Sequence, residues 1–331
     1  MPKILRFFLI LRIIAFHYAP IINFKTSNPP NPTPPMIRFV NAKINIGLNV
    51  VAKRQDGYHD LETVFYPVGL ECGLPHQPQP FDDILEVGYQ PGDISGCRFQ
   101  FLGRPIDCPP KKNLVVKAAS LFLRHYNEDF DDLGNYGMFE ISLDKHLPDG
   151  AGLGGGSADA AFTLQLLNET VGKKYDDRQL AEMALKLGAD CPFFLYNKPC
   201  FAEGIGEVLN PINLSLEGYT LLIVKPDIHV STADAFAGIV PKKPEFDLRF
   251  LPYLPIEDWK NKVVNDFEST VFAKHPELGI LKQSLYDGGA IYASMTGSGS
   301  AIYALFDSAD LARKERTRLE STYQAIWLFG L

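Results

Sequence analysis

Apolar and polar positions alternate between residues 42 and 51, AKINIGLNVV, which predicts a strand buried on one face only. Its apolar face holds Ile44, Ile46, Leu48 and Val50, and its polar face holds Lys43, Asn45 and Asn49. Asp56-Gly57 then separates two strand-like runs, a strong short-range signal for a hairpin. The hairpin places Lys43 and the residues after the turn, Tyr58 and His59, on neighbouring strands.

Further along, the pattern alternates between the helical period and the strand period. Residues 113–126 and, later, 157–172, 175–188 and 309–323 have the helical period, whereas residues 138–148, 218–226 and the two halves of 293–306 read as strands. Asp190 stands where a helix begins, and Ser231 opens a capping-box pattern with Asp234. Residues 81–112 are hard to assign and are expected to form irregular strands. Because no regular βαβ repeat appears, the sequence predicts an α+β protein of two domains that divide near residue 215.

The first thirty-five residues differ from the rest. An apolar run, KILRFFLILRIIAF, is interrupted by Arg12 and is too short for a membrane span, and the Pro/Asn stretch SNPPNPTPP follows it. We expect residues 1–35 to be an unstructured or non-native extension, with Met36 as the true start. An amphipathic membrane anchor is the alternative, and we expect no stable membrane insertion.

Composition narrows the possible functions. The formal net charge of −7 and the absence of long basic runs argue against a non-specific nucleic-acid binder and favour a small-molecule partner. The 5 cysteines form no C-x-x-C pair, so the sequence predicts neither a disulfide framework nor a zinc site. A reducing cytoplasm is the expected location, and monomer and homodimer both stay open.

A glycine-rich loop, LPDGAGLGGGSADAA, joins a predicted strand to a predicted helix at residues 147–161. Gly150, Gly152 and Gly155 match the dinucleotide pattern G-x-G-x-x-G, but a second helix follows where that fold requires a strand. A P-loop is excluded as well, because no Lys-Ser or Lys-Thr follows the glycines. Glycines let the backbone approach an anion closely, and the next helix offers free N–H groups, so the loop is interpreted as a phosphate cradle rather than a plain turn.

Five segments together resemble the GHMP superfamily of small-molecule kinases. They are NAKINIGLNVVAKRQDGYHDLETVF, LPDGAGLGGGSADAA, LGADCPFFL, FAEGIGEVL and TGSGSAIYALF, in collinear order from about Met36 to the C-terminus. The pairing of AKINIGL with DGYH is similar to members that phosphorylate the 2-hydroxyl of a cytidine diphosphate-linked methylerythritol in the non-mevalonate pathway. The resemblance implies a ribosomal-protein-S5-like domain at residues 36–215, a ferredoxin-like α/β sandwich at 216–331, and ATP and Mg²⁺ as cofactors.

The resemblance also implies roles for individual residues. Asp190 becomes the candidate base and Lys43 the group that stabilises the developing alkoxide. The ATP-binding candidates are Pro148, Asp149, Gly150, Ala151, Gly152, Leu153, Gly154, Gly155, Gly156, Ser157 and Ala158, with Asn113 and Lys145 near the adenosine and Ser157 as a possible Mg²⁺ contact. The substrate-binding candidates are Asn45, Tyr58, His59 and Thr232. Asn49, which is uncharged and on the same strand face as Lys43 and Asn45, is also expected to line the site. The TGSGS turn is expected to support the donor loop, and the charge of Asp149 is expected to point away from phosphate or to be offset by a cation.

Simpler interpretations of these residues stay open. From the residues alone, Asp190 and Ser157 read as helix caps, Lys43 as a solvated lysine, and Tyr58 and His59 as ordinary hairpin residues. Two alternative functions remain: a GHMP kinase for another alcohol, such as a sugar, homoserine or a mevalonate-like acceptor, and a catalytically silent nucleotide-binding member.

Overall fold

The computed structural model describes residues 33–69, 81–91, 96–106, 108–130 and 137–331. The expectation for residues 1–32 lies outside these ranges. The first strand begins at Thr33. Residues 33–35 were expected to be part of an unstructured extension, and for them that expectation is wrong. No helix in the described part of the chain is long and apolar enough to cross a membrane.

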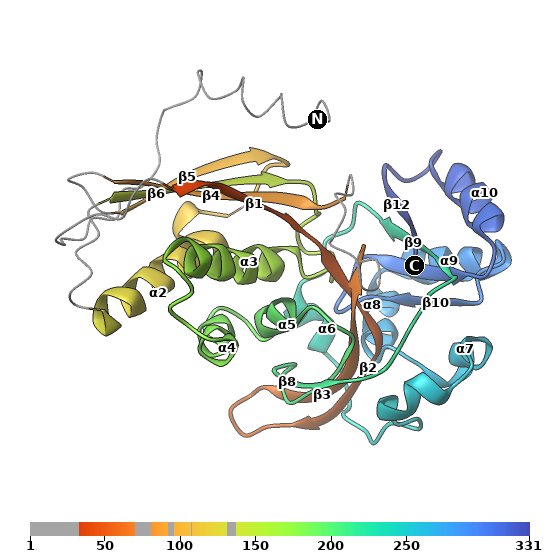
Figure 1. Ribbon diagram of the computed structural model, residues 1–331. Helices are drawn as coiled ribbons and strands as arrows, with labels where there is room; N and C mark the ends of the chain where they lie inside the picture. The colour runs from red at the N-terminus through yellow and green to blue at the C-terminus, as the bar shows by residue number, and fades with distance from the viewer. Residues whose placement is uncertain (1–32, 70–80, 92–95, 107, 131–136) are drawn as a thin grey trace.

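Three four-stranded sheets organise the chain (Figure 1). The first has the order β1-β4-β6-β5, formed by β1 (Thr33–Val40), β4 (Asp83–Pro91), β6 (Gly137–Lys145) and β5 (Gly96–Gly103). The second has the order β2-β3-β7-β8, formed by β2 (Ala42–Lys53), β3 (His59–Val68), β7 (Cys200–Glu203) and β8 (Val208–Pro211). The third has the order β10-β11-β9-β12, formed by β10 (Tyr292–Met295), β11 (Ile302–Phe306), β9 (Thr220–Lys225) and β12 (Ala325–Gly330).

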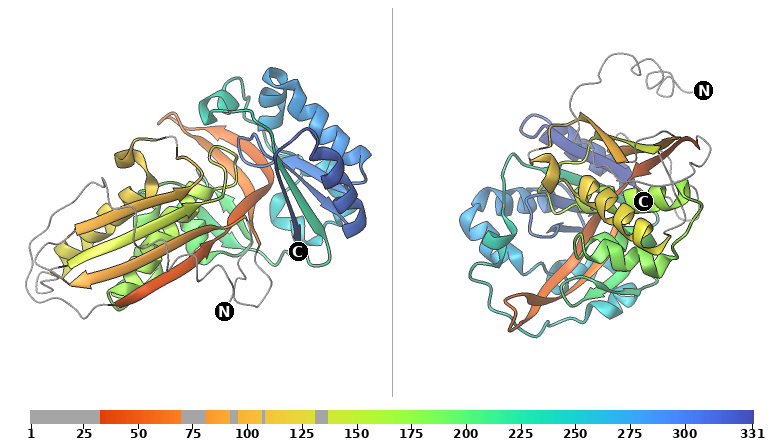
Figure 2. Two further views of the ribbon diagram at one scale, coloured as in Figure 1. Left: turned by 90° about the horizontal axis from the view of Figure 1, so that it is seen from above. Right: turned by 90° about the vertical axis from the view of Figure 1, so that its left-hand side faces the viewer.

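Helices cover one face of the first sheet. They are α2 (Leu114–Asp129), α3 (Gly155–Thr170), α4 (Asp177–Leu185) and α5 (Cys191–Tyr196), with the short 3₁₀ turn η2 (Pro110–Lys112) before them. Figure 2 shows them beneath the sheet, and together they enclose the largest hydrophobic core. Residues 81–112 were expected to form irregular strands, but β4 and β5 each pair with β6 without a register shift. The irregularity in this sheet lies between Thr33 and Met36 of β1.

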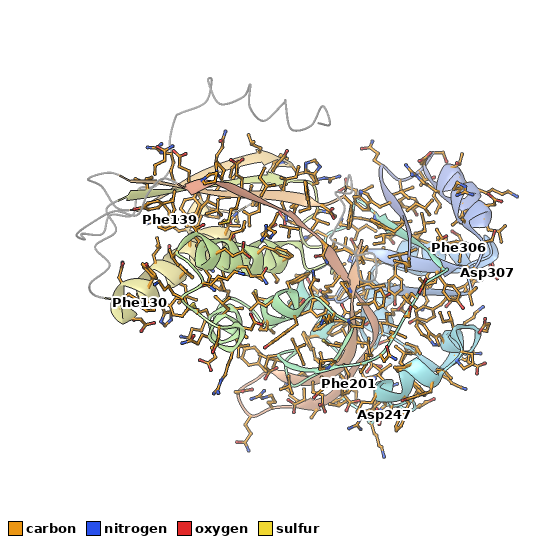
Figure 3. The ribbon with its side chains drawn as sticks, viewed as in Figure 1. Phe130, Phe139, Phe201, Asp247, Phe306 and Asp307 are labelled. Carbon is orange, nitrogen blue, oxygen red and sulfur yellow. The ribbon has the colours of Figure 1, made fainter. Side chains whose placement is uncertain are left out.

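The third sheet belongs to a β-α-β-β-α-β arrangement, which is that of a ferredoxin-like sandwich. Between β9 and β10 lie α6 (Thr232–Phe236), η3 (Leu248–Tyr253), η4 (Ile256–Asp258), α7 (Trp259–Lys262), α8 (Phe267–Lys274) and α9 (Pro276–Asp287), and α10 (Ala309–Leu319) precedes β12. Figure 3 shows Phe139, in the first core, and Phe306, in the core of this sheet, at opposite ends of the molecule. Because every strand of this sheet follows residue 219, we propose a domain division near residue 215.

The β2–β3 hairpin runs between these two parts, and its first strand is buried on both faces (Figure 1). The prediction that only one face of this strand is buried is therefore wrong, because sheets and helices pack against both of its faces. A bulge at Gly47, whose φ is +68°, also shifts the pairing: Ile46 faces Val64 but Leu48 faces Thr63. Since consecutive residues point to opposite faces, the bulge moves Leu48 to the face of Lys43.

The bulge also corrects the prediction for Asn49, which was expected to line the site beside Lys43. Asn49 pairs with Glu62 and is buried away from the cleft described below.

Candidate active site

A cleft of about 1160 Å³ lies where the hairpin, the glycine loop and the start of α5 meet. Its lining includes most of the predicted site residues, namely Lys43, Asn45, Tyr58, His59, Pro148, Asp149, Gly150, Ala151, Gly152, Gly154, Gly155, Gly156, Ser157, Asp190 and Thr232. Four other predicted residues do not line it: Leu153, Ala158, Asn113 and Lys145. The chain therefore gathers residues from both ends of its sequence into one concave site.

Lys43 and Asp190 form an ion pair at the centre of this cleft. The Lys43 Nζ lies 3.3 Å from Asp190 Oδ2 and donates a 2.6 Å hydrogen bond to Asn45 Oδ1. The lysine side chain is 3% exposed, whereas that of Asp190 is 34% exposed. A solvated lysine is thus excluded: the ammonium is fixed beside a carboxylate that remains open to the cleft.

Asp190 occupies the N-cap position of α5, but its side chain accepts no capping hydrogen bond. Pro192 in the first turn removes one of the N–H groups that a cap satisfies. The alternative interpretation, in which the Asp190 side chain caps the helix, is therefore wrong. Its carboxylate is free for chemistry in the cleft.

The glycine loop needs its glycines at specific positions. Gly150, Gly152 and Gly154 have φ values of +62°, +76° and +75°, which L side chains rarely adopt. A Cβ on Gly152 would lie 2.0 Å from the carbonyl oxygen of Thr296, and one on Gly154 would lie 2.8 Å from Phe194. Three of the glycines therefore serve the path and packing of the loop.

The remaining two glycines begin α3. Gly154 is the N-cap residue, so the helix starts at Gly155, and Ser157 in its first turn is not the cap. A Cβ on Gly156 would meet only Leu114, at 3.7 Å. Because both Gly156 and Leu114 line the cleft, this glycine leaves open space at the free N–H groups of a 16-residue helix.

The TGSGS turn supports the loop, as expected. Thr296 donates its hydroxyl proton to the Gly152 carbonyl at 3.0 Å and accepts the backbone N–H of Asn45 at 3.1 Å. Ala301 N–H adds a 3.3 Å bond to the carbonyl of Ala151. The turn thereby joins the glycine loop to β2, which carries Lys43.

Lys145 lies beneath the loop rather than in the cleft. Its ammonium lies 2.6 Å from Asp83 Oδ2 and 2.7 Å from Asp159 Oδ2, and all three side chains are buried. Asp83 Oδ1 also accepts the backbone N–H groups of His146 and Leu147. Asp83, which the sequence reasoning missed, therefore ties the entry of the loop to the first turns of α3.

The charges of this buried cluster are unequal, with two carboxylates around one ammonium. Burial raises the pKa of Asp159 well above its ordinary value, against the attraction of Lys145. Burial also raises the pKa of Asp149, whose Oδ1 lies 3.9 Å from Lys145 Nζ. The offsetting cation expected for Asp149 is thus Lys145.

Asn113 and Ser157 have structural partners as well. Asn113 caps α2 by accepting the Val115 N–H at 2.8 Å. Burial raises the pKa of the Cys191 thiol to about 12, although a hydrogen bond with Ser157 favours the thiolate. Cys191 is fully buried.

Aromatic side chains gather at the other end of the cleft. The His59 ring stacks on Phe236 with a centroid distance of 4.7 Å and an interplanar angle of 19°. Tyr58 is 60% exposed at the rim, and Thr232 lies one helical turn before Phe236. The sequence reasoning missed Phe236, and its only signal was an aromatic residue at the end of the short helix that Ser231 caps.

The cleft offers few protein ligands for a metal ion. The described residues contain no group of three or more His, Cys, Asp or Glu side chains placed to hold a metal. Its lining carboxylates are Asp149 and Asp190, and Ser157 adds a hydroxyl. This sparse set suits Mg²⁺, which typically takes one or two protein oxygens together with substrate phosphates.

The chain is similar to known kinases in both its N-terminal and its C-terminal parts. Residues 113–198 match the GHMP kinases N terminal domain, and residues 256–325 match the GHMP kinases C terminal domain. The 4-diphosphocytidyl-2-C-methyl-D-erythritol kinase of Bacteroides thetaiotaomicron is 48% identical over 272 residues, which cover 82% of this chain and 92% of the relative. That of Bacteroides fragilis is 46% identical over 279 residues, covering 84% and 95%.

Solved structures agree with this assignment. A crystal structure of 4-(cytidine 5'-diphospho)-2C-methyl-D-erythritol kinase superimposes with a TM-score of 0.70 and 31% identity, covering 88% of this chain and 98% of the other. A homoserine kinase from Cytophaga hutchinsonii shares only the fold, at 18% identity and a TM-score of 0.52, with 87% and 93% covered. The chain belongs to the GHMP kinases and, within them, to the 4-diphosphocytidyl-2-C-methyl-D-erythritol kinase family.

Proposed function

We propose that this protein transfers the γ-phosphoryl group of ATP to the 2-hydroxyl of 4-diphosphocytidyl-2-C-methyl-D-erythritol, in the non-mevalonate pathway to isopentenyl diphosphate. The observation that carries the proposal is the Lys43–Asp190 pair, which faces the same cleft as the glycine loop. A cradle for the donor phosphates and a group for the acceptor hydroxyl are the two parts that phosphoryl transfer to an alcohol requires.

Asp190 takes or orients the proton of the acceptor hydroxyl. Its carboxylate faces the cleft without a capping bond, so it can accept that proton as the oxygen attacks the γ-phosphorus. Lys43 stabilises the negative charge that develops on the oxygen, and its hydrogen bond to Asn45 fixes the ammonium in place. Because the transition state of phosphoryl transfer is loose, positioning by these groups contributes more than proton removal.

The donor phosphates lie against the glycine loop and the N-terminus of α3. Backbone N–H groups there bind phosphate oxygens, and the open space at Gly156 lets them approach. Ser157, Asp149 and Asp190 are the lining residues that would hold Mg²⁺, which would supply positive charge to neutralise the phosphates. Asn113 and Lys145 have no place in this proposal as nucleotide contacts, because neither lines the cleft.

The acceptor's cytosine lies at the aromatic end of the cleft. His59 and Tyr58 offer stacking surfaces and hydrogen-bond donors, and Phe236 extends the stacked surface. Thr232 lies on the same helix as Phe236 and lines the path toward Lys43. A flat aromatic base at one end and a hydroxyl at the other fit this division of the cleft. The cytoplasmic location stays a prediction.

The test is ADP release by the full chain with Mg²⁺-ATP and each of four acceptors: the cytidylyl methylerythritol, homoserine, mevalonate and galactose. The proposal expects turnover with the first alone. Turnover with another alcohol would assign the chain to a different acceptor, and ATP binding without turnover on any of them would make it a silent member.

A further inference from the structure

His229 lies where the donor loop meets the segment that carries the acceptor site. It lines the cleft two residues before Ser231, and a Cβ built on Gly150 would lie 3.4 Å from its Nδ1. The imidazole therefore lies in van der Waals range of the start of the glycine loop. Thr232 and Phe236 follow in the same segment.

The backbone that carries His229 is held firmly. Lys225 Nζ donates to the carbonyls of Pro226 and Ile228 at 2.6 and 3.1 Å, and Ser300 Oγ donates to the Ile228 carbonyl at 2.5 Å. Ser300 is fully buried in the TGSGS turn that also supports the donor loop. The backbone next to His229 is thus held by the same turn that supports the loop.

His229 has no partner of its own within the described residues. The other lining side chains that can carry positive charge are engaged: Lys43 with Asp190, Lys186 with His125, and His59 with the ring of Phe236. No hydrogen bond, ion pair or ring contact is formed by His229 in the described part of the chain. An exposed imidazole held by a rigid backbone and facing a phosphate loop is available to a ligand.

The charge of the cleft supports a phosphate as that ligand. Its lining has two lysines, Lys43 and Lys186, and two carboxylates, Asp149 and Asp190, so its fixed charges cancel. Both proposed substrates carry several phosphate charges, and the imidazole of His229 offers an N–H donor that no described protein group uses.

We propose that His229 donates a hydrogen bond to a phosphate oxygen at the junction of the two substrates and so adds affinity for one of them. The inference rests on the proposed function. ATP supplies such an oxygen from its triphosphate and the acceptor supplies one from its diphosphate. The two sources are separated by measuring KM for each substrate independently.

The experiment compares the wild-type chain with His229→Ala, His229→Gln and His229→Lys, and with His275→Gln, a histidine outside the cleft lining, as control. A charge-assisted hydrogen bond predicts that His229→Ala raises one of the two KM values about tenfold while kcat changes less than about threefold. His229→Lys recovers most of that loss, and His229→Gln recovers part of it.

An increase in KM for ATP identifies the triphosphate of ATP as the group that His229 binds. An increase in KM for the acceptor identifies the diphosphate of the acceptor instead. If both KM values stay within about twofold of wild type, or if His229→Lys is no better than His229→Ala, the proposal is wrong. Wild-type turnover, measured first, shows separately whether the proposed function holds. Far-ultraviolet circular dichroism of each variant excludes misfolding as the cause.

Discussion

The ammonium of Lys43 lies 3.3 Å from the carboxylate of Asp190, and the two residues come from β2 and from the start of α5. The lysine is buried and the carboxylate is partly exposed, so the pair presents its acidic member to the cleft. In the proposed mechanism, this arrangement orients the acceptor hydroxyl between a proton acceptor and a stabilising charge.

Replacing Lys43 with Met is expected to lower kcat about a hundredfold or more, because removal of one preorganised donor to a developing anion has an effect of this size. Steady-state ADP release measures it. The matched control is Lys262→Met, at the end of α7, where the lysine side chain is half exposed. This variant should leave kcat unchanged. A normal kcat for Lys43→Met would contradict the proposed role of Lys43 in stabilising the developing charge.

Two glycines of the loop should respond differently to alanine. Gly152→Ala forces a Cβ into the Thr296 carbonyl at a positive φ, so the melting temperature should fall by several degrees. Gly156→Ala meets no close neighbour and gains helix propensity, so stability should be unchanged or higher. Its added methyl lies at the proposed phosphate site, and KM for ATP should rise. Thermal melts and ATP titrations test both outcomes, and a normal KM for Gly156→Ala would contradict the placement of ATP.

Asp83 and Asp159 should differ in their contributions to stability. Asp83→Asn leaves the buried Lys145 ammonium poorly paired, and breaking a buried pair costs about 3–5 kcal/mol of unfolding free energy. Asp159→Asn should cost less, because burial already favours the neutral form of that carboxyl. Urea denaturation of the two variants gives the comparison, and a larger loss for Asp159→Asn would contradict the assignment of charge.

The pH dependence of stability follows from the same shift. The pKa of Asp159 is raised in the folded state, so its contribution is complete below its unfolded value of about 3.9 and is lost as the pH rises through the folded pKa. Asp159→Asn should therefore flatten the decline in stability above about pH 4. Urea midpoints between pH 4 and pH 8 test this, and an unchanged slope would exclude Asp159 as its source.

Phe236→Leu should weaken the acceptor without affecting the donor. Loss of an aromatic stacking contact is worth about 0.5–1.5 kcal/mol, which corresponds to roughly a twofold to tenfold rise in KM for the cytidylyl substrate. KM for ATP should stay constant. The control is Phe272→Leu on α8, because Phe272 packs against the same hydrophobic core as Phe236 but does not line the cleft. Equal changes in both KM values would point to a general loss of packing.

Local signals predicted much of this molecule. The hairpin follows from Asp56-Gly57 between two alternating runs, and the loop from its glycines, since turn chemistry and periodicity act over a few residues. The bulge at Gly47 was missed, because one extra residue in a strand is detected only from its partner strand. It made the prediction for Asn49 wrong.

Contacts between segments that are distant in the sequence could not be predicted from the local pattern either. Asp83 reaches Lys145 from a neighbouring strand, and His229 reaches Gly150 from the segment between β9 and α6. Neither has a local motif, and each depends on how the sheets pack. The resemblance to GHMP kinases was the source of the roles predicted for Lys43 and Asp190, and the structure places the two residues side by side.

The most direct test of the account is the kcat of Asp190→Asn for the cytidylyl methylerythritol, measured beside wild type at saturating Mg²⁺-ATP. Asparagine keeps the shape of the side chain, and no capping bond is lost from α5. Because the buried Lys43 loses its carboxylate partner, circular dichroism and a thermal melt first establish that the variant is folded at the assay temperature. The account predicts a decrease of about a hundredfold or more, the scale of a positioned proton acceptor. A kcat within about threefold of wild type would contradict the central role given to Asp190.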